Sequence, residues 1–245
     1  MSLSKTFSTS SRVLRQLGHD PRTVAMLFIV PPILLTIMKY VFQGQPQTFN
    51  SIAPMLLGIF PMVMMFLITS IVTLRERTTG TLDRLMTMPM TKLDFIFGYA
   101  IAFSFLGFCQ ALISGGVMLG LLNVSVLGGA LPTIVAVVFA AFLGTSLGLF
   151  LSAFATSEFQ AIQFMPAFIF PQLLTCGLFI ARDQMAKPLQ WFADVMPLTY
   201  SVDAMKQVTL HASWTSELTR DLIVVAAFGI AALILGSITI RRQES

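Results

Sequence analysis

The clearest candidate for chemistry in this sequence is a serine between two glycines. Gly144, Ser146 and Gly148 form the pattern G-x-S-x-G, which in serine hydrolases sets the nucleophile on a sharp strand-to-helix turn. Such a serine also needs a histidine as its general base. His19 and His211 both fall outside the long apolar runs, whereas Ser146 lies within one. An intramembrane serine protease is therefore only an alternative, and no catalytic residue is assigned.

The same glycines have a second interpretation as small residues between packed helices. Gly144 and Gly148 are separated by four positions, and so are Gly116 and Gly120. This spacing lets the backbones of two membrane helices approach closely. We therefore expect both pairs to lie at helix contacts.

Nucleotide and metal chemistry have no candidate residues. A phosphate-binding loop ends in Gly-Lys-Ser/Thr, and no lysine of this chain follows a glycine. Cys109 and Cys176 stand within apolar runs, as expected for small buried side chains rather than a disulfide framework. We expect no cofactor and no metal in this chain, so energy from ATP would have to come from another polypeptide.

Composition points to a membrane protein. Of the 245 residues, 56% are hydrophobic and 11% are charged, and the mean hydropathy is +0.82. Soluble domains have roughly 25% charged residues. The net charge of +4 does not indicate nucleic-acid binding, because the basic residues flank apolar runs instead of forming a patch.

The apolar runs predict a single all-α membrane domain over residues 1–245. A helix needs about 20 apolar residues to cross the hydrocarbon and satisfy its own backbone. Six spans are predicted, at residues 24–42, 52–74, 95–122, 131–155, 160–180 and 222–240. The third and fourth form a tight hairpin, with its turn at residues 123–132. About 23 polar and mixed residues precede the first run, so we expect no cleaved signal peptide.

Basic residues predict the orientation, because cytoplasmic flanks are enriched in Lys and Arg. Ten of them flank one side: Lys5, Arg12, Arg15, Arg22, Arg75, Arg77, Arg84, Lys92, Arg241 and Arg242. Four lie together on the other side, within residues 181–221, where acidic residues balance them: Arg182, Lys187, Lys206 and Arg220. Both termini are therefore expected in the cytoplasm and residues 181–221 outside.

The segment before the first span predicts a short amphipathic helix. Val13, Leu14 and Leu17 alternate with Arg12 and Arg15 in a pattern suited to the cytoplasmic membrane interface. A disordered tail is the alternative interpretation.

The most informative segment is residues 75–89, between the second and third spans. Gly80 permits a sharp turn, Thr81 can cap a new helix, and Pro89 ends it after about two turns. The residues Leu82, Leu85, Met86 and Pro89 then share one apolar face, while Asp83, Arg84 and Thr87 point elsewhere. This pattern predicts a short crosswise helix whose face enters a groove on a partner, unless the segment is only a solvated connector.

The order ERTTGTLDRLMTMP closely resembles the signature loop of type-2 ATP-binding-cassette (ABC) transporter permeases. In that family the loop is the coupling helix, which rests in a cleft of a cytoplasmic ATPase subunit. The resemblance assigns this role to Glu76, Arg77, Gly80, Thr81, Leu82, Asp83, Leu85 and Pro89.

A second match lies between the fifth and sixth spans. The run PLTYSVDAMK at residues 197–206 looks like the short external helices of the same family. It implies an external helix region that includes Trp191, Pro197, Tyr200 and Asp203. Family members often have prolines near positions 181 and 186, where this chain has alanines, so the external turn is expected to differ.

The resemblance covers essentially the whole chain and implies its function. It implies a membrane subunit of a bacterial ABC exporter in the plasma membrane, paired with a second permease, identical or homologous. Two separate ATPase subunits would bind ATP and Mg²⁺. Because the spans contain almost no ionisable residue, the expected cargo is apolar or amphipathic: a drug, a lipid or a lipid-linked metabolite. No substrate-binding residue is assigned.

A passive or ion-coupled carrier is the alternative transport function. Its pathway would use ionisable residues at membrane depth, which are almost absent here. Lys39, near the outer end of the first span, is expected to extend to the interface rather than bind a ligand. Two sets stay open between a pathway and helix packing: the glutamines Gln110, Gln163 and Gln172, and the methionines Met62, Met64 and Met65.

Overall fold

The structure is a computed structural model that describes residues 3–79 and 92–239. Every regular element in these two ranges is helical. The elements are α1 Leu3–Gly18, α2 Pro21–Val41, α3 Pro46–Thr78, α5 Lys92–Gly116, the π-helical turn η1 Val117–Leu121, α6 Ala130–Ser152, α7 Glu158–Thr175, the 3₁₀ turn η2 Arg182–Gln184, α8 Lys187–Val195, α9 Pro197–Leu210 and α10 Ser216–Thr239. The expectation of an all-α chain is confirmed for these residues.

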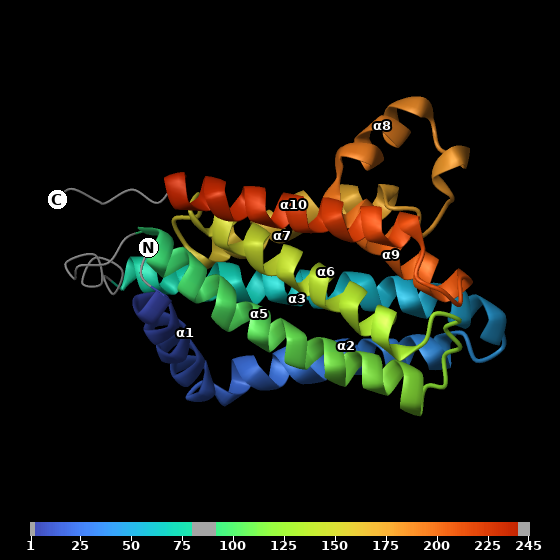
Figure 1. Ribbon diagram of the computed structural model, residues 1–245, viewed down its shortest axis with the longest axis horizontal. Helices are drawn as coiled ribbons and strands as arrows, with labels where there is room; N and C mark the ends of the chain where they lie inside the picture. The colour runs from blue at the N-terminus through green and yellow to red at the C-terminus, as the bar shows by residue number, and fades with distance from the viewer. Residues whose placement is uncertain (1–2, 80–91, 240–245) are drawn as a thin grey trace.

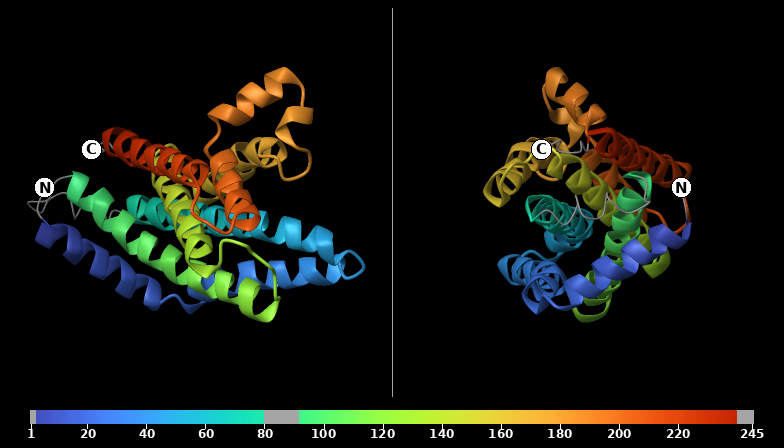
Figure 2. Two further views of the ribbon diagram at one scale, coloured as in Figure 1. Left: turned by 45° about the vertical axis from the view of Figure 1, so that its right-hand side comes forward. Right: turned by 90° about the vertical axis from the view of Figure 1, so that its left-hand side faces the viewer.

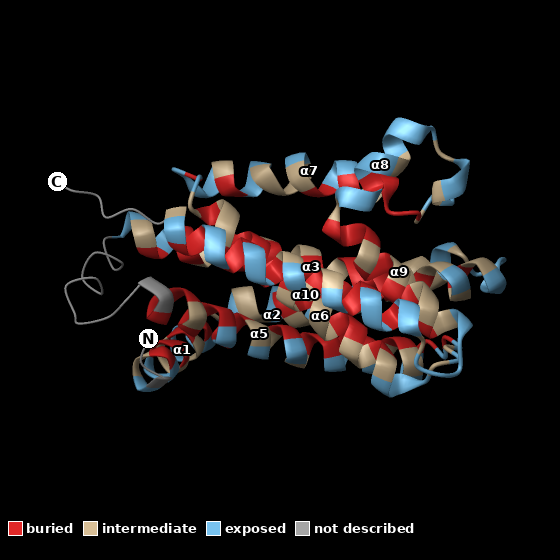
Figure 3. Cartoon of the chain, turned by 45° about the horizontal axis from the view of Figure 1, so that its top comes forward, coloured by how far each residue is buried: buried red, intermediate tan, exposed pale blue. Residues whose placement is uncertain are grey.

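The long helices lie side by side along the longest axis of the molecule (Figure 1). Helix α6 is central and packs against α3, α5 and α10. Helix α8 projects from the bundle and is largely exposed, whereas the facing sides of α3 and α6 are buried (Figure 3). Helix α1 and the last turn of α10 lie at one end of the bundle, and the α2–α3 turn lies at the opposite end.

Five helices are long and apolar enough to cross a membrane: α2, α3, the combined α5–η1 helix from Asp94, α6 and α10. They match five of the six predicted spans, including the predicted hairpin of α5 and α6. Helix α7, Glu158–Thr175, covers residues 160–175 of the remaining prediction, but it contains polar residues and two prolines, among them Gln160, Gln163, Pro166 and Pro171. At 1.5 Å per residue it is about 27 Å long. The sixth span is therefore not among the five.

Close approach between α3 and α6 depends on two glycines. A Cβ atom on Gly144 would lie 2.0 Å from the backbone oxygen of Met62, and one on Gly148 would lie 2.5 Å from that of Phe66. The predicted small-residue contact is confirmed for this pair. The prediction for Gly116 and Gly120 is wrong for the described residues, because no atom of another described helix lies within 4 Å of the Cβ position at either glycine.

Helix α1 forms as predicted, but two of its apolar residues, Val13 and Leu17, are buried by protein, while Phe7 is exposed. Val13 and Leu17 are 1% and 4% exposed and belong to a cluster with Phe95 and Tyr99 of α5. Figure 2 shows α1 beside α5 in the left-hand view, and the two helices contact each other. Asp20 then caps α2 by accepting hydrogen bonds from the backbone and hydroxyl of Thr23, which lower the pKa of the Asp20 carboxyl. The position of α1 at a membrane interface stays a prediction.

Helix α3 is longer than its predicted span of 52–74. Its 33 residues correspond to about 50 Å, more than the roughly 30 Å of hydrocarbon. The extra turns at its end contain Arg75, Glu76 and Arg77, which therefore belong to the helix and not to a loop. The predicted span ends where the apolar run ends, but the helix does not, because Arg and Glu are good helix formers that continue it.

Candidate functional site

The first residues of the predicted signature loop, Glu76 and Arg77, lie at the end of α3 and are described by the structure. Glu76 is 3% exposed and accepts two hydrogen bonds from Arg12 of α1, at 3.1 Å to Oε1 and 3.0 Å to Oε2. The Tyr99 hydroxyl of α5 donates to Glu76 Oε2, and Arg12 donates to that hydroxyl at 2.6 Å. The carboxylate therefore joins three helices through one buried cluster.

The cluster is held as an ion pair. Partial burial of Arg12 opposes its charge, but the hydrogen bond to Glu76 and the nearby negative charge raise the pKa of this guanidinium. Two parallel N–H···O bonds also fix the relative orientation of α1 and α3. Removing one member of such a pair leaves a buried partner unsatisfied, so breaking the pair is costly.

The two neighbours of Glu76 contact further helices. Arg75 Nε lies 2.9 Å from Glu158 Oε1 of α7, in an ion pair whose members are both about half exposed. Arg77 donates from Nη1 to the backbone oxygen of Ser152, the last residue of α6. A cation at a helix C-terminus satisfies carbonyl groups that lack helical partners. Three consecutive residues thus attach the end of α3 to α1, α5, α6 and α7.

The remaining residues of the predicted coupling segment lie outside the described residues: Gly80, Thr81, Leu82, Asp83, Leu85 and Pro89. Their role stays a prediction. The helices on either side are described, since α3 ends at Thr78 and α5 begins at Lys92. Glu76 and Tyr99, which contact each other, lie close to these two ends.

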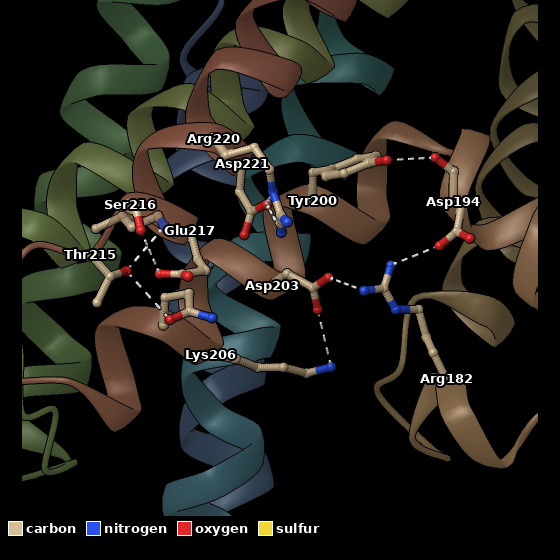
Figure 4. Close-up of polar contacts among 12 residues, drawn as sticks. Arg182, Asp194, Tyr200, Asp203, Lys206, Thr215, Ser216, Glu217, Arg220 and Asp221 are labelled. Carbon is tan, nitrogen blue, oxygen red and sulfur yellow. Dashed lines mark hydrogen bonds and ion pairs between the residues drawn. The ribbon is translucent and has the colours of Figure 1, made fainter.

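At the other end of the bundle, Arg182 is the centre of a second polar cluster (Figure 4). It makes ion pairs with Asp194 at 3.2 Å and with Asp203 at 2.9 Å, and Lys206 lies 3.4 Å from the same Asp203. The Tyr200 hydroxyl donates to the backbone oxygen of Asp194 at 2.6 Å. These contacts hold the segment with η2 and α8 against α9.

The other predicted residues of this region take no part in that cluster. Pro197 is the buried first residue of α9, and Trp191 on α8 is 71% exposed. The segment is helical, as the resemblance implied. Its ion pairs were not predicted from the sequence, because Arg182 lies 12 and 21 positions from its two partners. Only Asp203 and Lys206, at helical spacing, give a local signal.

An apolar cavity of about 500 Å³ lies among α2, α3 and α7. Met38, Phe60 and Met165 line it together with other apolar side chains, and its lining includes no ionisable residue. Of the three methionines considered above, only Met64 lines it, while Met62 and Met65 are fully buried in the core.

Two of the candidate glutamines bond to other helices. Gln110 donates to the backbone oxygen of Leu27 on α2, at 3.2 Å. Gln172 accepts a hydrogen bond from the backbone of Leu198, at the start of α9. Both are buried and have packing roles, whereas Gln163 is exposed.

The serine–histidine alternative is not supported by the geometry. Ser146 donates its hydroxyl proton to the backbone oxygen of Phe142, one turn earlier in α6. His19 and His211 each bond to a carbonyl of their own helical segment. No hydrogen bond joins Ser146 to either histidine, so G-x-S-x-G here is a helix-packing pattern.

Comparison with known proteins agrees with this arrangement. A family model described as ABC-2 type transporter matches residues 5–210, which include the clusters at both ends of the bundle. The chain belongs to this family. It is thus an ABC-2 permease, as the loop resemblance implied.

Two relatives illustrate the family. The chain is 26% identical over 187 residues to the probable multidrug ABC transporter permease YbhR of Escherichia coli strain K12, covering 74% of this chain and 50% of that protein. It is 30% identical over 148 residues to ABC transporter G family member 20 of Dictyostelium discoideum, covering 58% of this chain and 20% of that protein. The matched part of the permease is thus half or less of each relative.

Proposed function

We propose that this permease moves an apolar or amphipathic solute out of the cytoplasm, driven by two separate cassette ATPase subunits. The ATPase subunits bind ATP and Mg²⁺, and a second permease, identical or homologous, completes the pathway. The observation that carries the proposal is the junction at the end of α3. There Arg75, Glu76 and Arg77 contact four helices immediately before the predicted coupling segment.

The junction suggests how movement would pass from the ATPase to the membrane. The coupling segment leaves α3 at Thr79 and returns to α5 at Lys92, and the Glu76–Tyr99 contact joins these helices. A displacement of the segment therefore acts on α3 and α5 together, and through Arg12 on α1. ATP shifts the permease between inward and outward states only if the ATPase contacts differ between them.

The topology belongs to the same proposal. Helix α7 is the sixth span, completed by the apolar residues 176–180 that follow it. Both termini and the α3 junction then lie in the cytoplasm of a bacterium, and α8 and α9 lie at the outer face of the inner membrane. The basic flanks of α1, α3 and α10 support this orientation.

The apolar cavity supports the class of cargo. Its walls offer no charged partner, so a bare ion would lose its hydration without compensation. An apolar or amphipathic molecule would be stabilised there by burial of its surface. A relative is named as a probable multidrug permease, which agrees with such a cargo.

A passive or ion-coupled carrier is the second candidate. It would use ionisable residues inside the spans, but Lys39, Glu76, Asp94 and Asp221 each lie within a few residues of the end of a described spanning helix. This distribution favours an external source of energy. Requirement for the ATPase separates the two functions.

We expect the double variant Leu82→Ala, Leu85→Ala to bind its cassette ATPase at least about tenfold more weakly. Apolar anchors in a groove each contribute more than about 1 kcal/mol to binding. The measurement is the amount of ATPase retained per permease after purification in detergent. Thr87→Ala, predicted on another face of the same helix, is the matched control. Equal retention by the double variant and the control would reject the groove interaction.

A further inference from the structure

The end of the bundle opposite α1 holds the cationic side chain of Lys39. Lys39 lies in the last turn of α2, and its Nζ donates to the backbone oxygen of Leu122, just after η1, at 3.0 Å. The side chain thus points across to the α5–α6 turn, although the sequence predicts that it extends to the interface. Within residues 3–79 and 92–239, no carboxylate forms an ion pair with Lys39.

The bond to Leu122 leaves donors available. An ammonium group has three N–H donors, and the carbonyl uses one of them. A charge at the edge of a membrane is stabilised by water, by a carboxylate or by an anionic ligand. Lys39 is half-buried and has no carboxylate partner in the described structure, so an anionic ligand would complete its environment.

A cavity of about 310 Å³ opens beside Lys39. This volume is at the lower end of the range of ligand pockets, about 300–1,000 Å³. Amide side chains converge on it from three segments: Gln43 after α2, Asn50 in α3 and Asn123 after η1. These amides have no hydrogen-bond partner among the described side chains and backbone, and no carboxylate lines the cavity. The walls offer one cation and several N–H donors, the set that recognises an oxyanion.

The backbone around Asn123 is consistent with a built site. The last turn of the α5–η1 helix is π-helical, a feature that frequently marks functional sites. Asn123 follows it with φ of 53°, a left-handed conformation that asparagine adopts more readily than most residues other than glycine. Leu122 and Asn123 both line the cavity.

The cavity also adjoins an apolar region. Phe42 lines this cavity and the 500 Å³ apolar cavity among α2, α3 and α7. A molecule with a phosphate at Lys39 therefore finds apolar side chains next to its headgroup, as a membrane lipid requires. We propose that Lys39, with Gln43, Asn50 and Asn123, binds the phosphate group of an anionic lipid at this end of the bundle. This site does not depend on the direction of transport or on an ATPase.

The test is lipid binding to the full chain in detergent, measured by native mass spectrometry. The probes are phosphatidylglycerol, diacylglycerol with the same acyl chains, and inorganic phosphate. We expect Lys39→Gln to weaken phosphatidylglycerol binding about tenfold, because it removes the charged donor of the hydrogen bond to the phosphate. Lys39→Arg should retain most of the affinity. Lys187→Gln removes an exposed charge at the start of α8, away from the cavity lining, and should have no effect.

The outcomes separate the ligand sources and the rival explanations. Weaker phosphatidylglycerol binding in Lys39→Gln, together with weak diacylglycerol binding in every variant, supports recognition of a lipid phosphate. Displacement of the lipid by millimolar inorganic phosphate supports the phosphate site with free phosphate as a second source. Asn50→Leu keeps the Lys39–Leu122 bond and should weaken phosphatidylglycerol binding a few-fold. This variant still tests the proposal if Lys39→Gln does not fold. Unchanged binding in Asn50→Leu and in any folded Lys39→Gln, or equal loss in Lys187→Gln, would overturn the proposal.

Discussion

We expect Glu76→Ala to lower the free energy of unfolding by about 3 kcal/mol. The substitution leaves Arg12 without its carboxylate and the buried Tyr99 hydroxyl without its acceptor. Breaking a buried ion pair by removing one partner costs about 3–5 kcal/mol, and the lower value applies because Arg12 is one-third exposed. The measurement is reversible unfolding of the purified permease in mixed micelles.

The matched control is Glu158→Ala on α7. It removes the carboxylate of the Arg75 ion pair, whose members are 51% and 48% exposed. Exposed pairs contribute about 0–1 kcal/mol, so this variant should unfold almost as the parent does. Similar losses in the two variants would mean that Glu76 is an ordinary surface charge, and the junction at the end of α3 would lose its support.

Gly144→Ala should cause a comparable or larger loss. Its new Cβ would lie 2.0 Å from the Met62 oxygen, a backbone atom that moves only if α3 and α6 separate. Overpacking costs about 1–3 kcal/mol when side chains can adjust, and here they cannot. We therefore expect at least about 3 kcal/mol in the same unfolding measurement.

Gly116→Ala provides a control of opposite expected sign. Gly116 ends α5, has helical φ and ψ, and has no atom of another described helix within 4 Å of its Cβ position. Alanine in a helix is about 0.5–1 kcal/mol more favourable than glycine. Equal destabilisation by the two variants would show that close contact of α3 with α6 does not determine the cost of Gly144→Ala.

Sequence reasoning predicted the features that depend on local composition. Apolar runs located five of the spanning helices, and turn residues located the α5–α6 hairpin. It could not distinguish Gly144, which faces α3, from Gly116, which faces open space, because both pairs have the same spacing. Which face of a helix meets a neighbour depends on tertiary packing that the spacing does not contain.

In the candidate site too, local sequence predicted which residues matter but not their partners in the fold. The signature pointed to Glu76 and Arg77, but their partners are distant in the sequence: Arg12 lies 64 positions from Glu76, and Ser152 lies 75 positions from Arg77. The sequence pattern predicts an interfacial charge at Arg12, since nothing in its local pattern indicates a buried acceptor. Lys39 was likewise expected to reach the interface, yet the end of η1 provides a closer acceptor.

The central claim is that this permease transports only when a separate ATPase drives it. The most direct measurement is ATP-dependent movement of a lipophilic dye across proteoliposomes containing the permease, with and without its cassette ATPase. We expect movement only with the ATPase and ATP together. A permease that moves the dye equally fast without the ATPase or without ATP would contradict the claim and favour a passive or ion-coupled carrier.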